Sequence, residues 1–241
     1  MEIIEVKNYD ELSTVTADLI EKQIKMKEDS VLGLATGSSP VGTYKELIKR
    51  NLDFSKVRTI NLDEYRGLAP DNKQSYIYFM RDNLFNHVNI KDENINIPNG
   101  LAEEGFEECL RYDKCIEDLG GIDLQLLGLG LNGHIGFNEP NTEFVKGTHV
   151  VTLSQSTIDA NSRFFENYEE IPREAITMGI KSIMDAGHIV LIVNGAKKAS
   201  ILKDALCGPI TPNVQASILQ LHNNVTVVAD KEALSELNKT F

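Results

Sequence analysis

The segment Val31–Pro40 reads VLGLATGSSP and combines an apolar run, a turn and the start of a helix. Its first half, Val31–Ala35, is apolar throughout, which is typical of a strand buried on both faces of a parallel sheet. Its second half supplies a glycine and two serines for a tight turn, and Pro40 suits the first turn of a helix. A strand followed directly by a turn and a helix is the repeating unit of α/β folds.

The same alternation continues on both sides of this segment, and the chain begins directly with a strand. Apolar, β-branched runs predict further strands at Val57–Leu62, Leu124–Leu129, His188–Val193 and Val225–Ala229. Amphipathic stretches predict helices at Asp10–Met26, with Asp10 as its N-cap, and at Val41–Arg50, Ser75–Phe85, Glu103–Leu119 and Lys197–Leu206. Strands separated by helices imply right-handed crossovers, so we expect a mostly parallel sheet covered by helices on both faces.

The composition is that of an acidic globular protein. The chain has 241 residues, of which 41% are hydrophobic, and no Pro/Ser/Gly-rich linker divides it, so residues 1–241 are expected to form a single domain. The formal net charge of −12 leaves no basic excess, which argues against nucleic acid and anionic membranes as partners. We find no apolar run long enough for a membrane span and no signal peptide, and Cys109, Cys115 and Cys207 lack metal-type spacing. These features predict a cytoplasmic protein with reduced thiols.

The turn that follows the first quoted strand is a candidate phosphate-binding site. Thr36, Gly37, Ser38 and Ser39 offer hydroxyls and free backbone N–H groups at the positive end of the next helix, an arrangement that suits a phosphate monoester. The alternative is an ordinary tight turn whose serines cap the helix. The Gly-x-x-x-x-Gly-Lys-Ser/Thr pattern of a nucleoside triphosphate loop is absent.

A second candidate follows the strand Val57–Leu62, where the sequence continues into Asp63-Glu64-Tyr65. A carboxylate at a strand end that is partly removed from water can have a raised pKa and act as a general base. The alternative is a loop acid that only caps the next turn. We favour the base, because the carboxyl ends of parallel strands share one edge of the sheet and this edge binds ligands.

The segment Leu127–Pro140, LGLGLNGHIGFNEP, is the most informative. Its glycines allow a close approach of the backbone, so that polar side chains can be directed into a cleft. Asn132, His134 and Glu139 are interleaved with them, and a histidine with a nearby carboxylate can form an acid–base pair near neutral pH. The glycine spacing also resembles a dinucleotide-binding loop, but the segment lies mid-chain and its final proline interrupts any following helix.

Two basic residues could neutralise a phosphate. Arg163 offers a bidentate guanidinium group, and Lys198 offers a point charge just after the predicted strand His188–Val193. The alternative for each is a solvated surface charge. The stretch Gly136–Pro172 is the least regular part of the chain and could hold a flap over a site. The remaining histidines are expected to be structural: His87, His149, His188 and His222.

Together, these segments resemble the glucosamine-6-phosphate deaminases, also called glucosamine-6-phosphate isomerases. The resemblance covers essentially the whole chain, and its blocks are ATGSSP from Ala35, NLDEY from Asn61, GLNGHIGFNEP from Gly130 and ANSRFF from Ala160. It implies a three-layer, Rossmann-like α/β fold without metal or organic cofactor. It also implies an enzyme of amino-sugar catabolism that converts glucosamine 6-phosphate and water to fructose 6-phosphate and ammonia.

The resemblance implies a role for each candidate residue. Asp63 matches the base that enolises the substrate, His134 the group that moves the ring-opening proton, and Glu139 its supporting acid. Asn132 occupies a position, also tied to ring opening, that is Asp in some members and Asn in others. The phosphate-holding set is matched by Thr36, Gly37, Ser38, Ser39, Arg163 and Lys198.

One departure from the family concerns regulation. Allosteric members are hexamers that use basic residues shortly after the Glu-Pro, together with an extended tail. The matching stretch Gly147–Val151 supplies no Lys or Arg beyond Lys146, so we expect a non-allosteric enzyme that is a monomer or a weak homo-oligomer. The alternatives are a 6-phosphogluconolactonase-like hydrolase and a sugar-phosphate-sensing domain of a transcription regulator. The sensing domain would need a DNA-binding module, and no basic helix-turn-helix segment is present.

Overall fold

The computed structural model describes residues 1–155, 158–159, 167 and 170–237. Their largest element is a seven-stranded sheet with the order β1-β10-β9-β6-β2-β3-β5, in which all neighbouring strands are parallel. The strands are β1 (Glu2–Val6), β2 (Val31–Leu34), β3 (Arg58–Asn61), β5 (Ile95–Asn96), β6 (Leu124–Gly128), β9 (Ile189–Val193) and β10 (Val225–Asp230). The predicted parallel sheet is confirmed, and each predicted strand lies in it.

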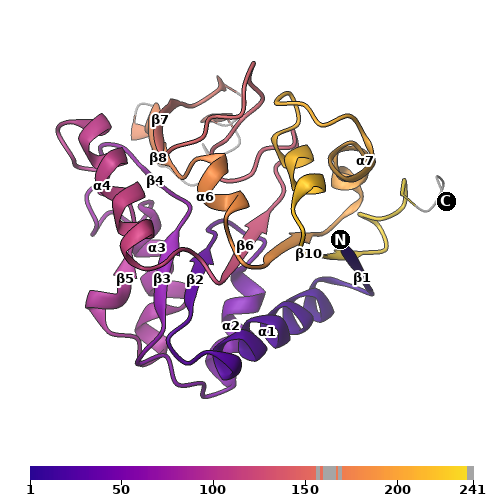
Figure 1. The fold of residues 1–241 in the computed structure, drawn as a ribbon, viewed down its shortest axis with the longest axis horizontal. Coiled ribbons are helices and arrows are strands. Elements are labelled where there is room, and N and C mark those ends of the chain that lie inside the picture. The colour runs from indigo at the N-terminus through magenta and orange to yellow at the C-terminus, as the bar shows by residue number, and fades with distance from the viewer. Residues whose placement is uncertain (156–157, 160–166, 168–169, 238–241) are drawn as a thin grey trace.

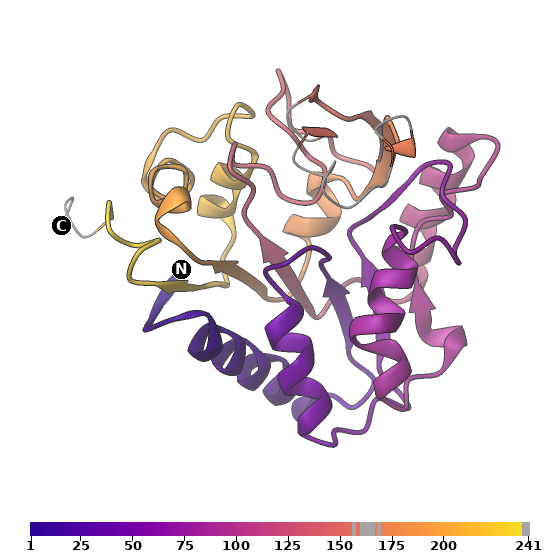
Figure 2. The same cartoon turned by 180° about the vertical axis from the view of Figure 1, so that it is seen from behind.

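Helices cover the two faces of this sheet, which gives three layers (Figures 1 and 2). The α-helices are α1 (Tyr9–Met26), α2 (Val41–Lys49), α3 (Tyr76–Asn83), α4 (Gly105–Asp118), α6 (Ile180–Met184) and α7 (Ala199–Cys207). Short 3₁₀ turns add η1 (Phe85–His87), η2 (Asp92–Asn94), η5 (Ala196–Lys198) and η6 (Gln215–Leu221). Buried residues of α1, α2 and α3 form one apolar cluster with the sheet, and those of α4, α6, α7 and η6 form the other.

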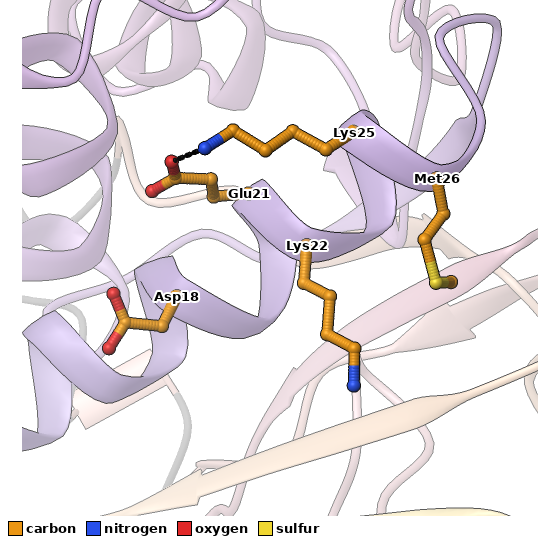
Figure 3. A pocket seen from close by; sticks show the side chains of 5 residues that line it. All are labelled: Asp18, Glu21, Lys22, Lys25 and Met26. Carbon is orange, nitrogen blue, oxygen red and sulfur yellow. Dashed lines mark ion pairs between the residues drawn. The ribbon is translucent and has the colours of Figure 1, made fainter.

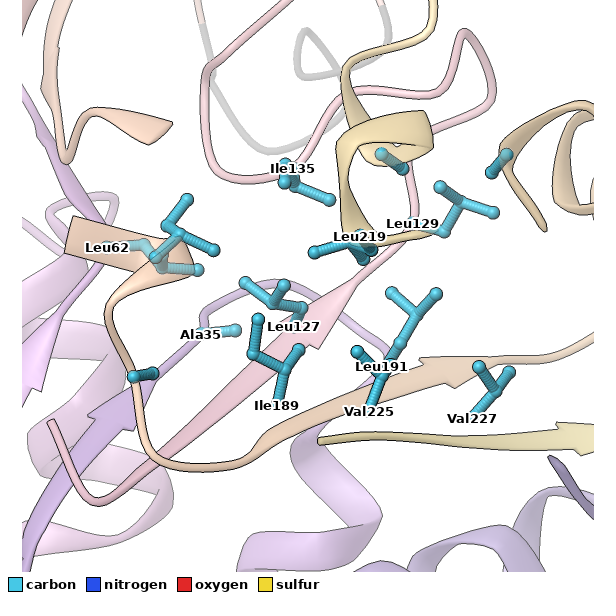
Figure 4. Packing of buried hydrophobic residues seen from close by; sticks show 14 of the residues in the cluster. Ala35, Leu62, Leu127, Leu129, Ile135, Ile189, Leu191, Leu219, Val225 and Val227 are labelled. Carbon is cyan, nitrogen blue, oxygen red and sulfur yellow. The ribbon is translucent and has the colours of Figure 1, made fainter. Parts of the chain in front are cut away.

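The sheet belongs to both clusters because side chains alternate along each strand. In β2, Val31 belongs to the cluster on the α4 side, whereas Leu32 belongs to the cluster on the α1 side. Figure 4 shows the α4-side cluster, where Leu127, Ile189 and Leu191 of adjacent strands pack near Leu219 of η6. Burial on both faces explains why these strands read as nearly continuous apolar runs.

A small antiparallel sheet was not predicted from the sequence. It has the order β4-β8-β7 and consists of β4 (Asp63–Tyr65), β8 (Glu174–Thr177) and β7 (His149–Thr152). The strand β4 follows β3 almost directly, and the backbone N–H of Met178 donates to the carbonyl of Leu62 at 2.7 Å. The small sheet therefore fixes the chain at the point where β3 ends. The strand β7 also lies within the stretch Gly136–Pro172 that was expected to be irregular, and β8 follows just after it.

Two residues predicted to lie at helix starts, Asp10 and Pro40, were assigned positions that are wrong by two residues and by one residue. Asn8, not Asp10, caps α1: its backbone is extended, and its Oδ1 accepts from the N–H of Glu11 at 3.0 Å. Asp10 lies in the first turn, where a negative charge also favours a helix. Pro40 is the N-cap of α2 and does not lie in its first turn. The predicted helix from Lys197 starts as the 3₁₀ turn η5 before it continues as α7.

The sequence also predicts structural roles for His188 and His222 and reduced thiols for the three cysteines. His188 Nε2 lies 2.9 Å from Thr226 Oγ1, and His222 Nε2 lies 2.8 Å from the carbonyl oxygen of Ala186, so both rings connect structural elements. The three cysteines form no disulfide. Within the described part of the chain, we find no helix that is both long and apolar enough to cross a membrane.

Candidate active site

The candidate residues are brought to one edge of the large sheet. The strands β9, β6, β2 and β3 are neighbours in the sheet and run parallel, so the segments that follow them emerge side by side. These segments carry Lys198 after β9, the loop 129–140 after β6, Thr36–Ser39 after β2, and Asp63 after β3. The structure thus places together all of the predicted site residues that it describes; Arg163 lies outside the described residues.

The carboxyl group of Asp63 is almost completely buried, with 6% of the residue exposed. Among the described residues, none donates a hydrogen bond to it. Burial, and then the charge of the neighbouring Glu64, raise its pKa to about 8. A Cβ atom added to Gly136 would lie 3.4 Å from Asp63 Oδ2, so the loop that carries His134 passes directly against this carboxyl group.

Backbone and side-chain hydrogen bonds shape the loop after β6. The N–H of Gly130 donates to the carbonyl of His134 at 3.0 Å, and the N–H of His134 donates to Asn132 Oδ1 at 3.2 Å. A Cβ atom on Gly130 would lie 2.4 Å from the His134 ring, so the imidazole packs on this backbone and no other residue fits there. In this structure Asn132 therefore shapes the loop through its side chain.

The imidazole of His134 is set up to be neutral. Burial lowers its pKa, the charge of Glu139 acts in the opposite direction, and Lys198 lowers it further. Its Nδ1 atom is buried and has no hydrogen-bond partner among the residues that the structure describes. A neutral imidazole can both accept and donate a proton, which is the property that a proton shuttle needs.

Glu139 is held by the start of the next segment. One oxygen of its carboxylate accepts from the backbone N–H of Ser154 at 3.2 Å, and the other accepts from the Ser154 hydroxyl at 3.1 Å. The residue also lines a cavity of about 320 Å³. His149, which was expected to be structural, lines the same cavity, and its Nδ1 lies 3.0 Å from the carbonyl oxygen of Gly147.

The turn after β2 is anchored by a residue that the sequence did not single out. The hydroxyl of Tyr9, the first residue of α1, lies within donating distance of the carbonyls of Ser38 at 2.9 Å and Ser39 at 3.1 Å. The same hydroxyl accepts from the N–H of Gly42 at 2.8 Å. Gly37 has a φ of +86°, a left-handed conformation that glycine adopts without strain. The turn is therefore fixed from outside, while its serine hydroxyls make no hydrogen bond to a described residue.

The only described lysine whose pKa falls is Lys198, and burial alone lowers it. No described carboxylate forms an ion pair with its ammonium group, whereas its neighbour Lys197 is exposed. The charge of Lys198 is thus partly desolvated and is not compensated by a described carboxylate. This is the state expected of a cation whose partner is an anionic ligand.

Three aromatic rings connect the strand that carries Asp63 with the loop that carries His134. The sequence did not single out these rings either. The ring centroid of Tyr76 lies 4.7 Å from that of Tyr65 and 5.9 Å from that of Phe137, on which it stacks at 9°. Tyr65 and Phe137 are 5.5 Å apart. The Tyr76 phenol also lies close enough to Thr36 for this neighbour to act on its pKa, against the larger effect of burial. The cluster therefore joins β4, α3 and the glycine-rich loop, and it lies next to the turn after β2.

A second cavity, of about 420 Å³, lies on the outer side of α1. Figure 3 shows its lining of Asp18, Glu21, Lys22, Lys25 and Met26, with an ion pair between Lys25 and Glu21. All of these side chains come from one helix, and none comes from the strand ends. No cluster of metal-binding side chains is found among the described residues. The chemistry of the molecule therefore centres on the edge of the sheet.

The fold and the site define a class of protein. It is an α/β enzyme with a buried carboxyl group, an imidazole and a partly buried lysine at the carboxyl edge of a parallel sheet. Residues 7–228 match the model of the glucosamine-6-phosphate isomerase/6-phosphogluconolactonase family. The chain belongs to this family.

The chain is also similar to several individual proteins. The chain is 55% identical to a glucosamine-6-phosphate deaminase of Thermoanaerobacter sp. (strain X514), over 98% of this chain and 94% of the relative. It is also 55% identical to a deaminase of Clostridium botulinum (strain Loch Maree / Type A3), over 99% of both chains. A solved monomeric glucosamine-6-phosphate deaminase superimposes with a TM-score of 0.95 at 45% identity, covering 98% of this chain and 100% of that one. A 6-phosphogluconolactonase from Trypanosoma brucei shares the fold, with a TM-score of 0.78, 21% identity and coverage of 98% of both chains.

We predict that Asp63→Asn stabilises the fold at alkaline pH. The pKa of this carboxyl group rises from 3.8 to about 8 on folding, so between these values the folded state retains a proton that the unfolded chain has released. Stability therefore falls as the pH rises through this window, and an asparagine escapes the loss. Urea unfolding should show the variant to be more stable than the wild type at pH 9, with the difference shrinking towards pH 4.

Asp53→Asn provides a control of opposite sign. Hydrogen bonds from Ser55 and Asn89 hold the pKa of Asp53 at about 2, so this charge stabilises the fold above pH 4 and its removal should destabilise it there. If Asp63→Asn were the less stable protein at pH 9, the carboxyl group would not be desolvated as described.

Proposed function

We infer that the chain is a glucosamine-6-phosphate deaminase, which converts glucosamine 6-phosphate and water to fructose 6-phosphate and ammonia. The observation that carries this inference is the buried carboxyl group of Asp63, which receives no hydrogen bond from a described residue and lies against the loop of His134. Such a group has the basicity to remove a proton from carbon, and the deaminase reaction requires this step. The likeness to deaminases along nearly the whole chain supports the same substrate.

The phosphate of the substrate would bind at the turn Thr36–Ser39 and the ammonium group of Lys198. The turn offers hydroxyls and N–H groups held by Tyr9, and the lysine offers a partly desolvated charge without a described protein partner. Arg163 completes the proposed set from outside the described residues. Binding energy at this distant phosphate would hold C1 and C2 of the sugar against the reactive groups.

Ring opening is the first chemical step, because the sugar is mostly a closed hemiacetal. We assign His134 to the transfer of the O1 proton to the ring oxygen O5, which breaks the C1–O5 bond and leaves an open-chain aldehyde. Its lowered pKa keeps the imidazole neutral before the reaction. The Glu139 carboxylate stabilises the positive charge that the imidazole carries while it holds the transferred proton. Asn132 supports this step by shaping the loop, since its side chain accepts from the His134 backbone.

Asp63 then acts on the open chain. Its carboxylate removes the C2 proton while O1 takes up a proton released by the ammonium group of the substrate, which gives a neutral enolamine. The same acid then returns its proton to C1, so that C1 becomes an alcohol carbon, C2 becomes an iminium and the carboxylate is restored. Water adds to C2, and ammonia leaves to give the ketone of fructose 6-phosphate. A pKa near 8 suits both halves of this proton transfer near neutral pH. No step draws on a metal or an organic cofactor.

We further propose a single catalytic domain over residues 1–241 that works as a monomer or a weak homo-oligomer in the cytoplasm, without activation by the N-acetylated sugar phosphate. The similarity to a solved monomeric deaminase supports this assembly. The sequence shortly after Glu139 also lacks a basic cluster. A sigmoidal rate curve that becomes hyperbolic with N-acetylglucosamine 6-phosphate would contradict the proposal.

The function is tested by a coupled assay for ammonia and fructose 6-phosphate in the presence of a chelator. We expect both products from glucosamine 6-phosphate in equal amounts, and no turnover by Asp63→Asn although this variant still binds substrate in calorimetry. The family also contains lactonases, which need neither a base for C2–H nor a route for ammonia. Hydrolysis of 6-phosphogluconolactone without any ammonia from the amino sugar would identify the chain as a lactonase.

The proposed role of His134 predicts a defect confined to ring opening. His134→Gln should lower kcat by about 10²–10⁴-fold, because a positioned acid–base group contributes rate factors of this order. A substrate analogue without the C5 hydroxyl cannot close the pyranose, and the variant should process it at nearly the wild-type rate. His87→Gln, at an exposed ring, is the control. An equal loss of rate on both substrates would exclude the role.

Lys198 should matter through substrate affinity. Lys198→Met removes a partly buried cation, so we expect KM for glucosamine 6-phosphate to rise about tenfold or more, with a smaller change in kcat. Inorganic phosphate should lose its strength as a competitive inhibitor in parallel. The matched control is Lys197→Met, because this neighbour is exposed on the same turn. Equal effects of the two substitutions would show that Lys198 does not hold the phosphate.

A further inference from the structure

The residue next to the proposed base carries a second buried carboxylate that the mechanism does not use. Glu64 is 2% exposed, and its neighbour Asp63 is 6% exposed. Successive side chains of a strand point to opposite faces, so the Glu64 carboxylate is directed away from the reacting carboxyl group. Two buried acids in succession oppose folding unless at least one of them is well bound.

Glu64 is bound by backbone N–H groups at the start of α3. One of its oxygens accepts from the N–H groups of Tyr65 at 2.8 Å and Tyr76 at 2.9 Å, and the other accepts from Ile77 at 2.9 Å. Tyr76 and Ile77 are the first two residues of α3, where N–H groups lack partners within the helix. Ser75 already caps this helix through the N–H of Tyr78. The bonds of Glu64 therefore add a connection between β4 and α3 to an existing cap.

This connection extends to the rest of the site through the aromatic cluster of Tyr65, Tyr76 and Phe137. Tyr76 begins α3 and stacks on Phe137, which follows Gly136 in the glycine-rich loop. Tyr65 ends β4 and contacts both rings. The side chain of Glu64 thus fixes the relative position of the strand that carries the base and the loop that carries the imidazole.

We propose that Glu64 is a positioning residue: by binding the N-terminus of α3 through its carboxylate, it holds the Asp63 carboxyl group in place against the loop of His134. This deepens the proposed function, on which it rests. Glu64 touches no reacting atom and acts only through β4 and α3. Because β4 has only three residues, the strand has few other hydrogen bonds with which to fix its direction.

The same carboxylate also acts on Asp63 through its charge. Burial raises the pKa of Glu64 to about 7, against the effect of its three N–H bonds, so the group is ionised above that pH. The charge adds to burial in raising the pKa of Asp63. Among the described residues, Tyr76 of α3 and Tyr112 of α4 are other titratable groups whose pKa the charge of Asp63 affects. Burial raises the pKa of both phenols, so both stay neutral at pH 8.

The test uses Glu64→Gln and Glu64→Asp in the intact enzyme. The glutamine removes the charge and the bond to one N–H group; we expect kcat to fall about 10- to 100-fold, with KM within about threefold. The acid limb of the kcat/KM profile should also move to lower pH, because Asp63 loses a repulsive neighbour. The aspartate keeps the charge but is shorter by one methylene, so kcat should fall while the acid limb stays in place.

Glu108→Gln is the matched control. Glu108 is also buried, at 5% exposure, and its carboxylate also accepts from a backbone N–H, that of Asn99 at 2.6 Å, but it lies on α4, and among the described residues no hydrogen bond joins it directly to β4. This substitution should lower stability in urea while leaving kcat within about twofold and the pH profile unchanged. If Glu64→Gln behaved in the same way, or if Glu64→Asp kept the wild-type kcat, the positioning role would be excluded.

A readout without turnover separates this proposal from the function on which it rests. Lowering the pKa of Asp63 reduces the amount by which its charge destabilises the fold at pH 9. Asp63→Asn should therefore stabilise the Glu64→Gln protein less at pH 9 than it stabilises the wild type. An equal gain in both backgrounds would contradict the link between the two carboxyl groups. Failure of the wild type to release ammonia would instead overturn the proposed function alone.

Discussion

The burial of one carboxyl group, that of Asp63, constrains the rest of this structure. Removal from water, with no described residue donating a hydrogen bond in its place, makes the charged form costly, and this cost raises its pKa. The protein must therefore stabilise the region by other means. It does so with the strand pairs of the small antiparallel sheet, the ring contacts of the aromatic cluster and the N–H groups that bind Glu64.

The parallel sheet determines where these groups meet. The segments that follow β9, β6, β2 and β3 come from widely separated parts of the chain, yet they emerge at adjacent positions along one edge. Each contributes a different kind of group: a cation, an imidazole, a serine-containing turn and a buried carboxyl group. The apolar clusters on the two faces of the sheet make this edge rigid, so that small side-chain shifts in the loops do not alter the spacing of the four segments.

The sequence predicted the central strands well because they are buried on both faces and are therefore almost purely apolar. It did not predict β4, which is short and polar and exists through its pairing with β8, more than a hundred residues away along the chain. The location of Asp63 and His134 followed from the rule that ligands bind at the carboxyl edge of parallel strands. The contributions of Tyr9 and Glu64 did not, because they depend on hydrogen bonds to distant backbone groups that leave no local pattern.

The contact of Tyr9 with the turn after β2 has a consequence for how affinity is distributed over the molecule. The first residue of the N-terminal helix holds the carbonyls of Ser38 and Ser39, so the shape of the proposed phosphate site depends on how firmly that helix is docked. Loosening the beginning of the polypeptide would then appear as weaker recognition of the sugar's distal end, while the chemistry at C1 and C2 kept its intrinsic speed. Recognition and conversion would thus respond to damage in separate parts of the protein.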